Sequence, residues 1–512
     1  MDLNAFLSTL RDQLGPEWVN TSEATAYRYG QHTLPGPDVP PTAVVYPGSV
    51  KEVQAVVNAA NRYRVPLHPI SMGNNMSLGT RAAAKPNQVI VDLGRRMNRI
   101  LEVDERLGYC VIEPGVTYQM LHDELARRGD TLMIDCTSGP PQGSVLGNAM
   151  DRGAGYTPYA DHFGSICGME IVLGNGELLH TGDYLGDHRM WNVSRYTFGL
   201  ALDGLLVQSN LGLVTRAGLW LMPRPPAMKA FHLTFPDDDD LGTLIDLARP
   251  LKLSGAVPSL FRISNDLWLI GEEEQHPEYA STGGRASLSD AGRKALQQRH
   301  GLGAWTASAA IYGGSEQQVD EAIGRVIEPF LKTGRATFIP HAQSERYPGL
   351  GVAASVFGGH PSANELRQLG WRPGGGVSCF TPGAPMVGEQ ANELQQLARS
   401  ILTDHGLEYL SMWVCAARFA RGLHNIVFNL RDPDEAERAD LAYLALSNAF
   451  HERGYSVGRA PIRYHPHHAT RRSPVVTRLG DGIKTLFDPQ GVISPGRYGL
   501  PSTAERSDLS TR

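Results

Sequence analysis

Apolar and polar residues near the start of the chain change from one spacing to another within thirty positions. The stretch TAVVYPGSVKEVQAVVNAANRYRVPLHPI, residues 42–70, opens with a short β-branched run, and VQAVVNAANRY then places apolar residues at helical spacing. Ser49 stands where a helix N-cap is expected. The run VPLHPI returns to an extended apolar pattern. We therefore predict strand, helix and strand, a β-α-β start.

The pattern continues with short strands and helices. A helix is predicted from about Thr117, and MEIVL-GNGE-LLHTG, residues 169–182, predicts a hairpin. MPRPP, residues 222–226, indicates a boundary, and beyond about 228 helical segments alternate with strands such as WTASAAIYGG. We expect SERYPGLGVAASVFGGHP, residues 344–361, to be a long loop and PDDDD, residues 236–240, to be a solvated loop.

A polar loop follows the first predicted β-α-β unit. SMGNNMSLGT, residues 71–80, combines glycine, asparagine and serine, which allow unusual backbone angles and tight turns. Such a loop can direct several N–H groups at one anion, typically a phosphate. A plain polar connection between strands is the alternative.

Other glycine-rich segments lie at 114–115, 139–155 and 209–212. They can offer backbone approach to a long ligand held between two subdomains, or they can be structural. The chain has neither a GxGxxG after its first strand nor a GxxxxGK[ST] motif, so a Rossmann site or a P-loop is not indicated.

Composition narrows the class of protein. The 512 residues suggest two or three domains, and 41% hydrophobic with 20% charged residues is typical of a soluble globular protein. A net charge of −6 argues against nucleic acid as a partner, and no apolar run approaches the length of a membrane span. The N-terminus predicts an amphipathic helix without the apolar core of a signal peptide. Five scattered cysteines disfavour a disulfide framework or a zinc site, so we expect a cytoplasmic protein.

Several motifs together resemble one family. EPGVTYQMLHDEL, GSVLGNAMDRGAGYTPYADHFGSICGMEIVLGNGELLHTG, SNLGLVTRAGLWLMP and FDPQGVISPGRYG are similar to segments of the vanillyl-alcohol oxidase / p-cresol methylhydroxylase flavoproteins. The resemblance is dense from about 42 to 223 and recurs at 370–382, 425–433 and 485–499. It implies an α+β fold, with a two-subdomain FAD-binding domain and an α/β substrate-cap domain over an antiparallel sheet. The division it implies is 1–227 (core about 38–223) for the first part of the FAD domain, 228–455 for the cap, and 456–512 for the return.

The resemblance also implies an extended FAD with its pyrophosphate on the 71–79 loop. The positions that would bind it are Ser71, Met72, Gly73, Asn74, Asn75, Met76, Ser77, Leu78, Pro114, Gly115, Gly143, Ser144, Gly147, Asn148, Gly155, Tyr156, Gly212, Val214 and Arg497. The implied reaction is oxidation of 4-alkyl- or 4-hydroxymethylphenols by hydride transfer to flavin N5.

The chain departs from this family at the phenol site. Leu78 stands where the first loop usually carries a phenolate-binding Tyr, and Gly139 aligns with an Asp that acts as acid/base. The usual Tyr-Arg pair is Gly458–Arg459. Because a phenolate in an apolar cavity needs such donors, Arg459 can instead hold a carboxylate through its two-pronged guanidinium. Pairing of Arg459 with an internal acid is the alternative.

Histidines are the candidates to replace the lost Asp, because their pKa suits proton transfer. RYHPHHATRR carries three of them after Arg459, and His424 in RGLHNIVFN lies on a strand-like run that can face a cavity. A polar surface loop is the alternative for RYHPHHATRR, and its spacing matches no common metal motif. We therefore name Arg459, His424 and His467 as catalytic candidates and expect no metal.

We expect the FAD to be non-covalent. Relatives carry a His or Tyr anchor after the glycine run, where this chain has Val377 and Ser378. Cys379 is a spare candidate, but on an alternating strand it points away from the side of Ser378. In more distant branches the anchor is a His in the first loop, where this chain has Asn74, Asn75 and Met76.

The function we predict is an FAD-dependent oxidoreductase acting on a small aromatic or conjugated substrate, such as an alkylphenol or aryl alcohol. Its electron acceptor is O2 or a cytochrome-like carrier, and we expect a homodimer. Two alternatives stay open. One is oxidation of a hydroxy acid or sugar-like alcohol, and the other is an FAD-binding scaffold that has lost catalysis.

Overall fold

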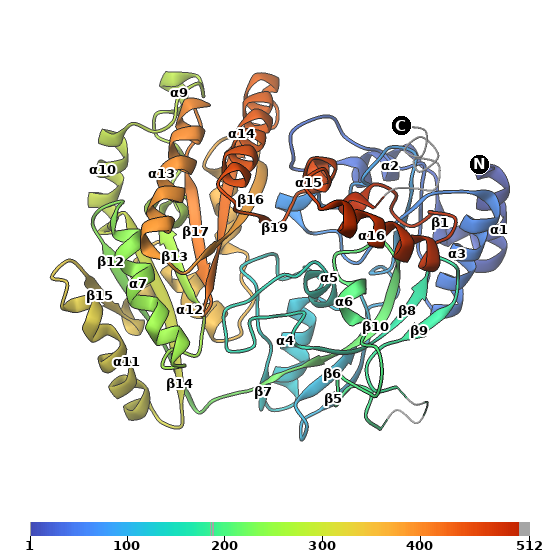
Figure 1. Ribbon diagram of the computed structural model, residues 1–512, viewed down its shortest axis with the longest axis horizontal. Helices are drawn as coiled ribbons and strands as arrows, with labels where there is room; N and C mark the ends of the chain where they lie inside the picture. Colours follow the sequence, from blue (N-terminus) through green and yellow to red (C-terminus); the bar gives the residue numbers. More distant parts are fainter. Residues whose placement is uncertain (1, 185, 187–188, 501–512) are drawn as a thin grey trace.

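The polypeptide forms two halves that meet along a broad contact (Figure 1). We describe a computed structural model for residues 2–184, 186 and 189–500. One half holds the N-terminal segments together with the C-terminal return, and the other holds the large antiparallel sheet from the middle of the chain (Figure 1).

The first subdomain confirms the predicted β-α-β start. Its four strands, in the order β1-β2-β4-β3, are β1 (Val19–Asn20), β2 (Ala43–Val45), β4 (Val89–Asp92) and β3 (Leu67–Ile70), with β2, β4 and β3 parallel. Its helices are α1 (Leu3–Leu14), α2 (Glu23–Gly30) and α3 (Val50–Tyr63). Ser49 caps α3 by accepting a hydrogen bond from the N–H of Glu52, as its position predicted.

The second subdomain is a five-stranded antiparallel sheet. Its order is β5 (Ile100–Asp104), β6 (Tyr109–Ile112), β10 (Gly212–Trp220), β8 (Ile166–Leu173) and β9 (Leu178–His180). A short pair joins β7 (Leu132–Met133) to β11 (Met222–Pro223), and the helices are α4 (Tyr118–Arg127), α5 (Val145–Met150) and α6 (Asp203–Leu206). The predicted helix after Thr117 and the predicted hairpin β8–β9 are both present.

The other half is built on one eight-stranded antiparallel sheet. Its order is β15 (Thr337–Pro340), β12 (Ala227–Phe235), β14 (Trp305–Gly313), β13 (Phe261–Asn265), β17 (Leu410–Cys415), β18 (Phe419–Phe428), β16 (Gly376–Pro385) and β19 (Val457–Arg459).

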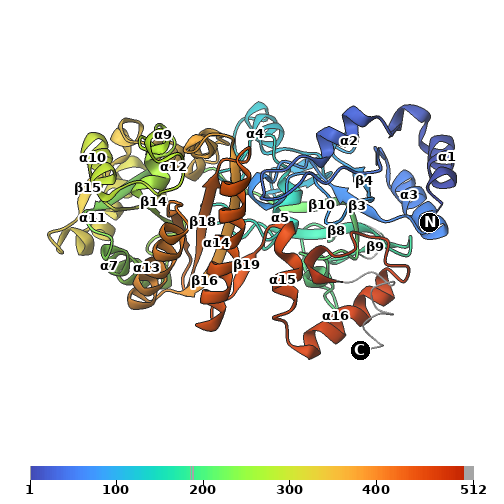
Figure 2. The ribbon, with the colours of Figure 1, turned by 90° about the horizontal axis from the view of Figure 1, so that it is seen from above.

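Four helices share one hydrophobic core with one face of this sheet, namely α7 (Asp240–Leu253), α11 (Glu316–Leu331), α13 (Gly388–Asp404) and α14 (Pro433–Glu452). Figure 2 shows α13 and α14 running alongside β16 and β18. The remaining helices before α14 are shorter: α8 (Asp266–Ile270), α9 (Tyr279–Thr282), α10 (Asp290–His300) and α12 (Leu350–Phe357).

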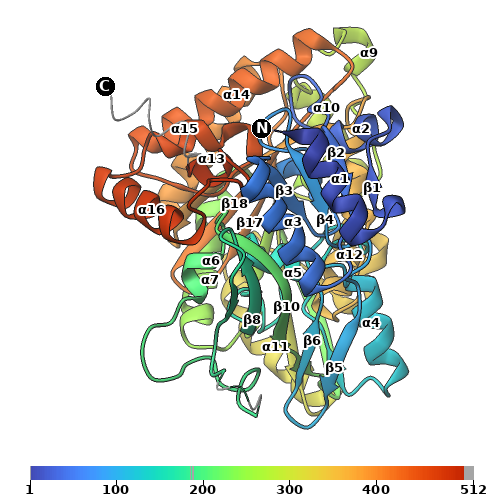
Figure 3. The same ribbon diagram turned by 90° about the vertical axis from the view of Figure 1, so that its right-hand side faces the viewer.

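The C-terminal segment returns to the first half. Helices α15 (His465–Ala469) and α16 (Pro474–Phe487) lie beside the N-terminal elements (Figure 3). Ile493 then forms a parallel bridge with Leu67 of β3. The return therefore completes the fold of the first half, and with the two antiparallel sheets it confirms the predicted α+β class.

Two loop predictions are wrong. Helix α12 occupies residues 350–357 inside the segment expected to be a long loop, because its apolar residues pack into the core between the halves. The aspartates of PDDDD are also not merely solvated. Asp238 pairs with Arg293 at 2.7 Å and with Arg399 at 2.8 Å, and the buried Asp240 pairs with Arg335.

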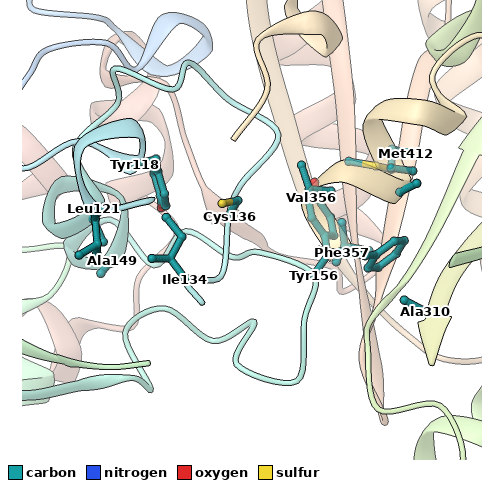
Figure 4. Packing of buried hydrophobic residues seen from close by; sticks show 14 of the residues in the cluster. Tyr118, Leu121, Ile134, Cys136, Ala149, Tyr156, Ala310, Val356, Phe357 and Met412 are labelled. Atoms are coloured by element: carbon teal, nitrogen blue, oxygen red, sulfur yellow. The ribbon is translucent and has the colours of Figure 1, made fainter. Parts of the chain in front are cut away.

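A single hydrophobic core crosses between the halves (Figure 4). Tyr118 and Ile134 belong to it on one side and Ala310 and Met412 on the other, while the rings of Tyr156 and Phe357 lie 6.1 Å apart. All five cysteines are buried and unpaired. Within residues 2–184, 186 and 189–500, no helix has the length and apolar character needed to span a bilayer.

Candidate active site and cofactor site

A cavity of about 360 Å³ separates the loops of the first half from the face of the large sheet opposite its covering helices. The loop side includes residues from 68–82, 137–151 and 206–214, and the sheet side includes β16, β17 and β18. Residues 459–465 and 497–498 of the C-terminal return close one end. The cavity therefore depends on three stretches far apart in sequence.

Most of the predicted cofactor positions line this cavity. They are Ser71, Gly73, Asn74, Asn75, Met76, Ser77, Leu78, Pro114, Gly143, Ser144, Gly147, Asn148, Tyr156, Gly212, Val214 and Arg497. Met72, Gly115 and Gly155 are outside the lining. A Cβ at Gly155 would lie 2.0 Å from Asp135 Oδ2, and one at Gly115 would lie 2.5 Å from the carbonyl oxygen of Gly94. These two glycines allow close packing behind the wall.

The loop wall requires glycine for steric reasons. Gly73 has a φ of +62°, and a Cβ there would lie 2.3 Å from Arg81 Cγ. A Cβ at Gly147 would lie 2.3 Å from Ser71 Oγ. Neither position has room for a side chain, so glycine allows the loop and the start of α5 to pack closely where both line the cavity.

Arg459 lies at the end of the cavity formed by the C-terminal return. It donates to Asp151 Oδ2 at 2.8 Å, and Tyr498 donates its hydroxyl to Asp151 Oδ1 at 2.8 Å. Burial opposes ionisation of Asp151, but the charges of Arg459 and Arg497 outweigh it and hold the pKa of Asp151 below its usual value. Arg459 Nε and Arg497 Nε find no hydrogen-bond partner among the described residues. Both guanidiniums therefore keep donor capacity for a bound group.

Glu365 is the carboxylate that sequence reasoning missed. It belongs to a 3₁₀ turn, residues 364–370, lines the cavity and is only 2% exposed. Its Oε1 accepts from Arg262 at 2.7 Å and from the Trp268 indole at 2.6 Å. Its Oε2 has no partner within the described chain. Arg262 also donates to Ser138, beside the Gly139 position of the missing Asp.

A second buried acid lies behind this one. Burial and the nearby Glu365 carboxylate raise the pKa of Glu272 to about 8. Glu272 therefore holds its proton at neutral pH, and the Arg262 guanidinium is paired with the Glu365 carboxyl group.

Successive side chains of β18 point to opposite faces of the sheet, and this determines which way His424 points. Leu423 and Asn425 line the cavity, whereas His424 points to the helix-covered face, where its Nδ1 lies 2.9 Å from Ser411 Oγ. Burial lowers the pKa of His424 to about 3. The geometry gives this catalytic candidate no access to the cavity.

Of the histidines after Arg459, one lines the cavity and one lies outside the cavity lining. His467 lies outside the cavity lining, with Nε2 3.2 Å from Ser447 Oγ. His465 does line it, and burial together with the Arg497 charge lowers its pKa to about 4. The segment is helical, not a surface loop, since it folds as α15 after a short 3₁₀ turn.

The positions after the glycine run also alternate. Val377 and Cys379 line the cavity, and Ser378 is buried on the other face. Burial raises the pKa of Cys379 to about 12, so its sulfur is a thiol and a poor nucleophile.

Comparisons with known proteins identify the family of this chain. Residues 41–182 match the family described as an FAD binding domain. The chain is 31% identical over 503 residues to the 4-cresol dehydrogenase [hydroxylating] flavoprotein subunit of Pseudomonas putida, covering 98% of this chain and 96% of that protein. The chain belongs to the vanillyl-alcohol oxidase / p-cresol methylhydroxylase family. The FAD cofactor and the FAD-dependent oxidoreductase class implied by the motifs are thus confirmed.

Two further proteins are similar to this chain over nearly its full length. The 4-ethylphenol oxidase of Gulosibacter chungangensis, solved as an isoeugenol complex, superposes with a TM-score of 0.94 at 30% identity, covering 98% of each chain. The 1'-carboxy-chondrochloren decarboxylase of Chondromyces crocatus is 29% identical, covering 97% of each.

Proposed function

We propose that this flavoprotein oxidises a small aromatic or conjugated substrate in the cavity, with Glu365 as the proton acceptor. The observation that carries the proposal is the unpartnered Oε2 of Glu365, a buried residue that lines the cavity. Leu78 on the loop side and Met412 and Leu423 on the sheet side also line the cavity and suit a flat ring. The relatives named above include enzymes named for 4-cresol and 4-ethylphenol, which supports an aromatic substrate.

The residues fit the cofactor. The glycine-containing segments around Gly73 and Gly147 line the cavity and would hold the dinucleotide, and Arg497 has an Nε without a partner among the described residues. Bound FAD supplies the hydride acceptor. We propose that it is held without a covalent bond, since Val377 and Ser378 stand in the places of the family anchor and the spare candidate Cys379, which lines the cavity, is a thiol.

Glu365 completes the chemistry for an alcohol substrate. As hydride leaves the carbinol carbon, the hydroxyl proton passes to Glu365 Oε2, and the product is an aldehyde. Arg262 and the Trp268 indole hold Oε1 and so fix the direction of the other oxygen. A carboxylate positioned in this way can take the role of the Asp that Gly139 replaces.

Arg459 contributes at the other part of the wall. It pairs with the internal acid Asp151, which was one of the two expectations, and its free Nε keeps it available to a substrate as well. We propose that it orients the substrate by its charge.

The remaining assignments are also proposals. We propose that the protein is a cytoplasmic homodimer that passes electrons to O2 or a cytochrome-like carrier. We also propose that each chain consists of a first part of the FAD domain at 1–227, a cap domain at 228–455 and a C-terminal return at 456–512. The name of the Pseudomonas putida relative, a flavoprotein subunit, supports a protein electron carrier. Sedimentation of the FAD-loaded protein measures the number of chains.

The test is anaerobic mixing of the FAD-loaded protein with 4-alkylphenols, cinnamyl and benzyl alcohols, and hydroxy acids. We expect bleaching of the visible flavin absorbance by at least one aromatic compound. Bleaching by hydroxy acids alone would contradict the proposal. An absence of bleaching by the whole panel, in protein that dithionite does reduce, would favour a scaffold without catalysis.

A further inference from the structure

Arg421 faces the same side of the large sheet as the cavity. It belongs to β18, two and four residues before Leu423 and Asn425, which line the cavity. The Cβ of a residue at Gly422 would instead contact the ring of His424, on the helix-covered face. Strand alternation therefore directs the Arg421 side chain toward the cavity side, just beyond its edge.

The Arg421 guanidinium occupies the space beside Gly458. A Cβ at Gly458 would lie 2.7 Å from Arg421 Cζ and Nη2. Gly458 is also an extra residue in its strand, because Thr381 pairs with Arg459 and Pro382 with Val457. The family's Tyr position is thus replaced by a glycine of β19 and by the guanidinium of Arg421, which reaches it from β18 across the intervening strand β16.

This guanidinium has no partner within the part of the chain that the structure describes. Neither a hydrogen bond nor an ion pair of its side chain is present there. Burial, then the charges of Arg459 and Arg152, lower the pKa of Arg421, and the more weakly acting Asp161 and Asp151 do not compensate. Asp151 is already engaged by Arg459 and Tyr498. The end of the cavity therefore carries positive charge without its counter-ion.

We propose that Arg421 and Arg459 together bind a carboxylate of the substrate, so that the substrate is an aromatic or conjugated acid. This inference rests on the proposed function and specifies the substrate class. A carboxylate has two oxygens and can accept from two guanidiniums at once, whereas a phenolate offers one oxygen and has lost both tyrosine donors, at Leu78 and Gly458. The name of the Chondromyces crocatus relative, a decarboxylase of a 1'-carboxy compound, is consistent with an acidic substrate.

The experiment measures binding of benzoate, benzamide and phenol to the oxidised holoprotein by perturbation of the flavin spectrum. Benzoate and benzamide share a shape and differ in charge. We expect benzoate to bind most tightly, and Arg421→Gln to weaken benzoate about tenfold or more while benzamide changes less than about twofold. Arg421→Lys should retain part of the affinity for benzoate.

A second variant keeps the test valid if Arg421→Gln binds FAD poorly. Gly458→Ala keeps the Arg421 side chain, but the added Cβ displaces its guanidinium. Benzoate affinity should therefore fall, whereas benzamide affinity should not. Equal losses for benzoate and benzamide, or tighter binding of phenol than of benzoate to the unchanged protein, would overturn the proposal.

The outcome is separable from that of the proposed function, because binding requires no turnover. Benzoate binding that depends on Arg421, without flavin bleaching by any aromatic substrate, would support the carboxylate site and contradict the oxidase or dehydrogenase activity. Bleaching by aromatic alcohols, with benzoate affinity unchanged in Arg421→Gln, would support the oxidase or dehydrogenase activity and contradict the carboxylate site. For turnover, 4-(hydroxymethyl)benzoate is the matching substrate and benzyl alcohol its uncharged control.

Discussion

The two walls of the cavity are built in different ways. The loop wall consists of short continuous segments, such as 71–79 and 143–148, in which neighbouring residues act together. The sheet wall and its C-terminal edge bring Arg262, Glu365, Arg421 and Arg459 together from separate elements. We propose that the loop wall holds the cofactor, and that the other wall, which can change one residue at a time, selects the substrate.

Substitution of Gly73 in the loop wall is expected to have the largest effect. Gly73→Val forces a β-branched residue into a φ of +62° and places its Cβ 2.3 Å from Arg81 Cγ. We expect FAD to be lost completely, as measured by flavin absorbance per chain after gel filtration. Gly324→Val, where a Cβ meets open space, is the control and should keep its FAD. Full FAD content in the Gly73 variant would show that this loop does not hold the dinucleotide.

Changing the substrate wall should leave the cofactor in place. Arg459→Ala is expected to lower kcat/KM about tenfold or more, about 1.4 kcal/mol, because it removes a charge that faces the cavity. Steady-state kinetics on the substrate found by flavin bleaching measure this. The FAD content should stay near that of the unchanged protein. Loss of FAD together with activity would instead show that Arg459 helps to hold the cofactor. Unchanged kinetics would remove it from the site.

The acid behind the wall should affect stability and not cofactor binding. The pKa of Glu272 rises from its usual 4.5 to about 8, so the folded state holds this proton more tightly than the unfolded state. Stability therefore falls as pH rises from about 5 to about 8, by a few kcal/mol at most. Glu272→Gln keeps the neutral shape and should flatten this part of the pH dependence in urea unfolding. A slope identical to that of the unchanged protein would contradict the assignment.

The smallest effect is expected outside both walls. His467 contacts Ser447 and lies away from the cavity, so His467→Gln should change kcat/KM by less than about twofold. A pH–rate profile in which one limb disappears in this variant would instead indicate that His467 accepts the proton.

Sequence reasoning predicted the loop wall well because its information is local. Glycine runs and turn residues act within a few positions, so 71–79 and 143–148 could be recognised from the sequence and from the family motifs. The β-α-β start and the β8–β9 hairpin were predictable for the same reason. Helix α12 was missed because the glycines and proline around it suggested a loop, whereas tertiary packing of its apolar residues stabilises it.

The substrate wall could not be predicted in the same way. Glu365 lies in an irregular turn without periodicity, and its partner Arg262 is 103 residues away. His424 was chosen as a candidate because the strand was recognised but its facing was not, and a one-residue shift in facing exchanges it for Leu423 or Asn425. Arg459 was found because the family motif contains it, but its partner Asp151 lies 308 residues away.

The measurement that bears most directly on this account is the rate of flavin reduction in Glu365→Gln, followed by anaerobic stopped-flow mixing with an aromatic alcohol. The variant keeps a similar shape and hydrogen bonding but cannot accept the proton. We predict full FAD content and a rate lowered by about 10² or more, with Glu272→Gln close to the unchanged protein. A Glu365→Gln variant that reduces its flavin at the unchanged rate would contradict the central role assigned to this carboxylate.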